Sequence, residues 1–105
     1  MSLKFENTQV LYLVQAMVGS ISANFRWVTL KMAEPRHVQL QIVLEKEDVD
    51  DREEIEEIIL KFEALQDTLI NLSVDIMIDD RSVDALHLEG RFVYGRKDSS
   101  TEAVK

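Results

Sequence analysis

The sequence predicts an α+β fold, a single domain whose elements follow the order α-β-β-α-β-β. We expect a mainly antiparallel four-stranded sheet with both helices on one face. The length of 105 residues fits one domain. Two segments have helical periodicity and four alternate with a period of two, and such runs favour this architecture. We place the domain at residues 1–96 and predict that residues 97–105, which have no apolar pattern, form a flexible C-terminal tail.

Residues 8–18 are predicted to form the first helix, because apolar residues recur there every three or four positions. Asn7 or Thr8 can cap its start, and Gly19 can end it. Its predicted core face holds Val10, Leu13, Val14 and Met17, and Tyr12 and Gln15 point the other way.

The segments 25–32 and 37–45 alternate and are predicted to form a hairpin around the turn at 33–36. The residues predicted to share the inward face are Arg26, Val28, Leu30, Met32, Val38, Leu40, Ile42 and Leu44.

A second helix is predicted from Asp50 to the region of residues 67–71. Asp50 and Glu53 have the spacing of a capping box. Leu60 is predicted on the outer face, among acidic residues. The predicted inner face holds Ile55, Ile58, Ile59, Phe62, Leu65 and Leu69.

Residues 73–78 and 86–94 are predicted to be the last two strands, with a bulge at Gly90 and with Phe92 and Tyr94 on one side. The sheet face without helices would then expose an apolar patch, and patches of this kind mark association surfaces. This second candidate interface comprises Phe25, Trp27, Val43, Met77 and Val93.

The net charge of −8 is concentrated in one segment. Residues 45–57 hold nine acidic and two basic residues, a net charge of −7, whereas the rest holds 11 acidic and 10 basic residues, a net charge of −1. Nucleic acids and anionic membranes are poor partners for so acidic a chain, so neither is expected. The segment is either a solvated helix start, favoured by the macrodipole, or a surface for a basic partner.

For a basic partner, the candidate contacts are the acidic residues around the second helix, with one exposed leucine as an apolar anchor. This partner-binding set is Asp48, Asp50, Asp51, Glu53, Glu54, Glu57 and Leu60.

No catalytic, metal or cofactor site is predicted. The chain has no cysteine, and its two histidines, His37 and His87, lack any zinc-ligand spacing. Its three scattered glycines form no phosphate-binding loop. We therefore expect a protein that is not an enzyme and needs no cofactor. The N-terminus has no signal-peptide pattern, which favours the cytoplasm.

Three segments, VGSISANFRWV at 18–28, DREEIEEI at 51–58 and FVYGRK at 92–97, resemble small acidic bacterial immunity proteins. Such proteins are paired with contact-dependent growth inhibition or colicin-like toxins. The resemblance implies a cytosolic antidote that blocks one cognate toxin domain, often a basic nuclease. No site residue is carried across by motif. The alternative hypothesis is a homodimeric structural or scaffold module that uses the sheet face around Trp27; a small enzyme with an unrecognised site is a third.

Overall fold

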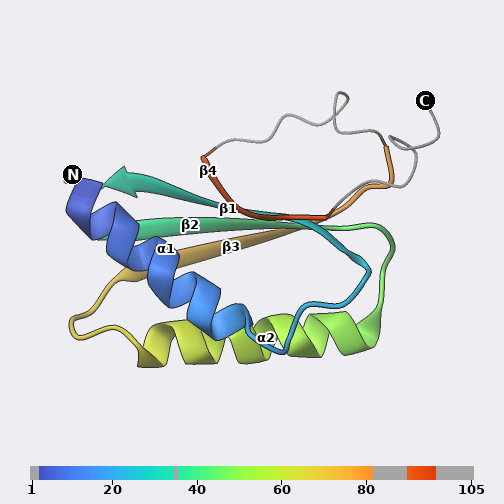
Figure 1. Cartoon of the computed structure of the whole chain (residues 1–105), viewed down its shortest axis with the longest axis horizontal. Coiled ribbons are helices and arrows are strands. Elements are labelled where there is room, and N and C mark those ends of the chain that lie inside the picture. The colour runs from blue at the N-terminus through green and yellow to red at the C-terminus, as the bar shows by residue number, and fades with distance from the viewer. Residues whose placement is uncertain (1–2, 35, 82–89, 97–105) are drawn as a thin grey trace.

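The computed structural model describes residues 3–34, 36–81 and 90–96, apart from the side chain of Glu34. The predicted order α-β-β-α-β-β is confirmed (Figure 1). Residues 86–89 of the last predicted strand and the predicted tail at 97–105 lie outside the described residues. The elements are α1 (Leu3–Met17), β1 (Phe25–Glu34), β2 (His37–Leu44), α2 (Val49–Ala64), β3 (Asn71–Ile78) and β4 (Arg91–Gly95).

The four strands form one sheet in the order β3-β2-β1-β4. β1 is antiparallel to both β2 and β4, whereas β2 and β3 are parallel. The sheet is therefore mixed, not purely antiparallel. The reason is α2, which carries the chain back to the starting end of β2 before β3 begins, as a parallel crossover requires.

Both helices pack on one face of the sheet and share its main core. Leu13 of α1, Leu30 and Leu40 of the sheet, and Ile58 and Phe62 of α2 are almost completely buried in it. A reciprocal pair of amide hydrogen bonds between Gln9 and Gln66, at 2.8 and 3.0 Å, joins α1 to the segment after α2. This pair satisfies the buried Gln9 amide.

α1 begins at Leu3, five residues earlier than predicted, so the proposed caps at Asn7 or Thr8 are wrong. It ends at Met17, one residue before the predicted end, and the predicted stop Gly19 has a φ of +80°. The predicted inner face is rotated: Val14 is 43% exposed, whereas Tyr12 packs against the core.

α2 is capped by Asp48, not by Asp50 as predicted. The Asp48 carboxylate accepts a hydrogen bond from the Asp51 backbone N–H at 3.0 Å. The helix ends at Ala64 with Leu65 as its C-cap, so Leu69 lies beyond it and is 93% exposed. The prediction that Leu69 lines the core face is therefore wrong.

Two bulges reverse the predicted sides of several strand residues. Phe25 pairs with Leu44 and Trp27 with Val43, so Arg26 is an extra residue in β1. The alternation shifts there, and Phe25 is buried in the main core instead of the helix-free face. Arg26, predicted to point inward with Val28, instead has its guanidinium 4.4 Å from the centroid of the Trp27 ring.

In β4 the extra residue is Val93, since Val28 pairs with Tyr94 and Thr29 with Phe92. Val93 and Tyr94 therefore both pack against the main core, and Phe92 lies against Trp27 with ring centroids 6.3 Å apart. The prediction of Phe92 and Tyr94 on one side is wrong. The bulge is at Val93, not at Gly90, which precedes the strand with a φ of +89°.

Candidate functional site

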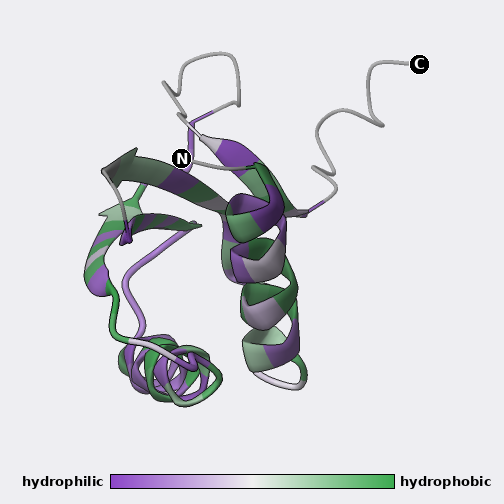
Figure 2. Cartoon of the chain, turned by 90° about the vertical axis from the view of Figure 1, so that its left-hand side faces the viewer, coloured by the Kyte–Doolittle hydropathy of each residue, from purple (hydrophilic) through white to green (hydrophobic). Residues whose placement is uncertain are grey.

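The solvent side of α2 carries six exposed acidic residues. The sixth, Glu63, lies near the C-terminal end of the helix, and the other five form what we call the acidic face: Asp50, Glu53, Glu54, Glu56 and Glu57. In the part of the chain that the structure describes, none of their side-chain carboxylates has a hydrogen-bond or ion-pair partner. Figure 2 shows both hydrophilic and hydrophobic residues along α2, and Ile55, Ile58 and Phe62 are buried on one face, as in an amphipathic helix. The five carboxylates are therefore free to meet a partner.

The acidic face opposes helix stability. Asp50 with Glu54, and Glu53 with Glu57, are like charges one helical turn apart, and each such pair costs about 0.2–0.5 kcal/mol. The macrodipole favours acids only in the first turn. Glu53, Glu56 and Glu57 lie beyond that turn, so a solvated helix start does not account for them.

Two large apolar side chains lie on the same side of α2. Val49 is 71% exposed and Leu60 is 61% exposed. Helical geometry at about 100° per residue places both within one face, with Glu53, Glu56 and Glu57 around them. Leu60 is thus where the sequence predicted it. The predicted partner-binding set omitted Val49 and Glu56, although wheel arithmetic places both beside Leu60.

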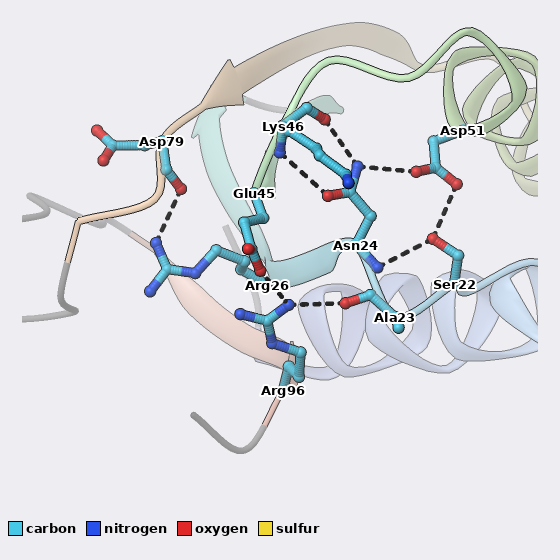
Figure 3. A network of polar contacts seen from close by, with 9 residues as sticks. All are labelled: Ser22, Ala23, Asn24, Arg26, Glu45, Lys46, Asp51, Asp79 and Arg96. Atoms are coloured by element: carbon cyan, nitrogen blue, oxygen red, sulfur yellow. Dashed lines mark hydrogen bonds and ion pairs between the residues drawn. The ribbon is translucent and has the colours of Figure 1, made fainter. Parts of the chain in front are cut away.

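Asp51 does not belong to this surface. It is 6% exposed, and its two carboxylate oxygens accept hydrogen bonds from the Ser22 hydroxyl and the Asn24 side-chain amide, both at 2.8 Å. Asn24 also donates to the Lys46 carbonyl at 2.7 Å. Figure 3 shows this network joining the loop before β1 to the start of α2. Asp51 therefore holds the helix in place.

Three further acids near α2 are engaged within the chain. Asp48 caps the helix. Glu47 accepts two hydrogen bonds from Arg52, both at 2.8 Å, and this guanidinium lowers the pKa of the Glu47 carboxyl. Glu45 pairs with Arg96 at 2.8 Å. The acidic segment therefore divides into acids with internal partners and the acidic face.

A second polar cluster fastens the strand ends beside this network (Figure 3). Arg96 donates to the Ala23 carbonyl at 2.7 Å, and Arg26 donates to the Asp79 carbonyl at 2.8 Å. The Asp79 carboxylate accepts hydrogen bonds from Arg81, which lower the pKa of Asp79 to about 2. These contacts stabilise the loops next to the start of α2.

The second candidate interface is not a common surface. Phe25 and Val93 pack in the main core on the helix side. Trp27, Val43 and Met77 do form one cluster on the other face, as expected, but Trp27 is 6% exposed and Val43 is completely buried. The prediction of an exposed apolar patch is therefore wrong for Phe25, Val93, Trp27 and Val43. The fifth member, Met77, is half-buried.

The helix-free face also has a polar hollow of about 320 Å³. Among its lining residues are Thr29, Lys31, Gln41, Ser73 and Asp75. Within the described ranges, no three His, Cys, Asp or Glu side chains are grouped so that they could hold a metal ion. Neither described helix is long and apolar enough to cross a membrane.

Comparison with known families decides the class of this protein. A family model described as "MafI2 immunity protein" matches residues 6–98, a range that includes α1 from Glu6 onward and the other five elements in full. The chain belongs to the MafI2 immunity protein family. A search of curated proteins found no match.

Membership of the MafI2 family supports the prediction of a bacterial immunity protein, with a toxin as its cognate partner. An immunity protein of this family acts as an inhibitor, which agrees with a role in binding and not in catalysis. The family match names no contact residue. The surface of this MafI2 protein that meets the toxin must therefore be argued from its own side chains.

Proposed function

We propose that this MafI2 family protein neutralises one cognate toxin domain with a basic, nuclease-like surface, and that it does so through the acidic face of α2 in the cytoplasm. The observation that carries this proposal is the set of five exposed carboxylates without internal partners, Asp50, Glu53, Glu54, Glu56 and Glu57. Their mutual repulsion has a cost in the free protein, and a cationic partner would remove it.

A nuclease holds its substrate with cations, because the phosphate backbone is densely charged. An acidic helix that occupies such a groove pairs with those cations and repels nucleic acid. Leu60 and Val49, exposed among the carboxylates, give this surface an apolar centre with a charged rim, which is the arrangement of an interface hot spot.

Two acids of the predicted partner-binding set have structural roles and are left out of the proposed interface. Asp51 is buried and Asp48 caps the helix, so their loss would disturb folding before it disturbed binding. Of the acids that the sequence selected, Asp50, Glu53, Glu54 and Glu57 remain, and Glu56 joins them. Variants that test the interface should be drawn from these residues.

The test compares two double charge reversals that change the net charge equally. Glu53→Lys with Glu57→Lys alters the acidic face, and Asp67→Lys with Asp80→Lys alters exposed acids outside it. The probe is the catalytically inactivated cognate toxin domain, with Kd measured by calorimetry. We expect the first pair to weaken binding about 100-fold and the control to change it less than about threefold. Equal effects of both pairs, or none from the first, would contradict the proposal.

A further inference from the structure

β3 has an edge with no strand beside it in the described part of the chain. The sheet order places β3 and β4 at its two edges. β3 pairs with β2 in one unbroken parallel register, from His37 opposite Asn71 to Leu44 opposite Ile78. Its eight residues therefore form a regular edge, of the kind on which a further strand can assemble.

The direction of the backbone groups along this edge follows from two hydrogen bonds. The Asn71 N–H donates to the Arg36 carbonyl at 2.8 Å, and the Asp79 N–H donates to the Leu44 carbonyl at 2.9 Å, both toward β2. Alternate residues of a strand direct their N–H and C=O groups to the same side. Leu72, Val74 and Ile76 must therefore present theirs to the free edge.

The two edge strands, β4 and β3, differ in how well they could pair with a further strand. β4 has five residues, is interrupted by the bulge at Val93 and is flanked by Gly90, and these features blunt an edge against pairing. β3 has no bulge, no proline and no lysine, and Asp75 is its only charged residue. Natural proteins usually protect edge strands of this length. We therefore expect another strand to pair with the open edge of β3.

We infer that the free edge of β3 binds an extended segment of the toxin as a fifth strand of the sheet. This inference rests on the proposed function and adds to it the kind of toxin segment that is bound. Main-chain hydrogen bonds to Leu72, Val74 and Ile76 would hold the segment, as in other cases of strand addition.

The neighbouring side chains define the segment's chemistry. On the helix side, Leu72, Val74 and Ile76 are half-buried against the main core, so the added strand presents apolar residues there. On the other side, Ser73 and Asp75 are exposed, and Asp75 favours lysine or arginine opposite it. The segment therefore alternates apolar and basic residues.

Charge favours the toxin over a second copy of this chain. Two copies joined edge to edge by antiparallel pairing of their β3 strands, about a twofold axis, would place two α2 helices on the same side of one continuous sheet. Each helix carries the acidic face, so the copies would repel each other. A basic toxin segment is instead attracted by the negative charge of the acidic face.

Amide hydrogen exchange, followed by NMR, tests the inference on the unaltered protein with and without the inactivated toxin domain. We expect the amides of Leu72, Val74 and Ile76 to exchange at least about tenfold more slowly in the complex than in the free protein. The amides of Ser73 and Asp75, which face β2, are the internal reference and should be protected in both states. A complex in which the outward amides stay unprotected would overturn the inference and leave the proposed function standing.

Two other outcomes are distinguishable. If no complex forms, the proposed function fails and this inference fails with it. If the outward amides are protected in the free protein and its mass by light scattering is doubled, a second copy occupies the edge and the toxin segment is excluded from it.

A substitution gives an independent test. Val74→Pro removes one outward N–H and leaves the inward ladder to β2 unaltered, and Val74→Ala is the control for the lost side chain. We expect Val74→Pro to bind the toxin domain about tenfold more weakly than Val74→Ala. Equal affinities would contradict the inference. If circular dichroism shows that Val74→Pro does not fold, the exchange measurement decides the question.

Discussion

Asp50 and Asp51 are adjacent acids with opposite environments. The Asp51 carboxylate accepts hydrogen bonds from Ser22 and Asn24 and is 6% exposed, whereas Asp50 is exposed. Asp51→Ala should lower the free energy of unfolding by about 2–3 kcal/mol, because it leaves two polar groups without their charged acceptor. Asp50→Ala should change it by less than about 0.5 kcal/mol. Urea denaturation measures both, and similar losses from the two variants would contradict this division.

The carboxyl of Asp79 gives a prediction about pH. Arg81 lowers the pKa of Asp79 from its ordinary value of 3.8 to about 2. Because the folded pKa is the lower one, the stabilisation is complete at pH values above 3.8 and is lost as the pH falls through about 2. NMR titration of the Asp79 carboxyl should find this midpoint, and Arg81→Gln should raise it. A midpoint that Arg81→Gln leaves unmoved would show that another group causes the shift.

The acidic face could be predicted from sequence because helical periodicity depends only on local spacing. Leu60 and Glu53 lie on the solvent side of α2, as the wheel arithmetic indicated. Asp51 could not be separated from them in this way. Its burial depends on Ser22 and Asn24, which are nearly 30 residues away along the chain and contact it only after folding.

At the scale of the elements, all six were predicted in the right order. The errors in assigning strand residues to a face of the sheet occur at the two β-bulges. A period-two pattern assigns Phe25 and Val93 to the helix-free face, but the bulges at Arg26 and Val93 shift the alternation. Arg26 and its neighbours carry no glycine or proline that would mark the bulge in the sequence. The helix between β2 and β3 was predicted, but the parallel pair that such a crossover forms was not.

Gly90 and Gly19 offer a matched pair of substitutions. Both have a positive φ, but a Cβ at Gly90 would lie 2.7 Å from the Leu30 carbonyl oxygen, whereas a Cβ at Gly19 would meet nothing within 4 Å. Gly19→Ala should cost about 1–2 kcal/mol for the left-handed backbone. Gly90→Ala should cost about 3 kcal/mol, because β4 must also move away from β1. Thermal or urea unfolding compares them, and equal losses would mean that the contact at Gly90 relaxes freely.

At the scale of the whole molecule, the fold separates two kinds of surface. The acidic face of α2 lies on the helix side of the sheet, and the open edge of β3 is at the end of the same sheet. The first acts at a distance through its charge, and the second acts only on contact through backbone hydrogen bonds. A toxin that used both surfaces would be attracted by the acidic face and then held by the open edge of β3.

This separation predicts how salt affects complex formation. Exposed charges are screened beyond about 10 Å at 0.1 M salt, so the association rate with the inactivated toxin domain should fall about tenfold between about 0.05 M and about 0.5 M salt. The dissociation rate should change little, because backbone hydrogen bonds and desolvated contacts are screened far less. In the Glu53→Lys and Glu57→Lys double variant the association rate should be lower and its salt dependence flatter. Stopped-flow or surface plasmon measurements separate the two rates, and an association rate independent of salt would mean that the acidic face does not guide the encounter.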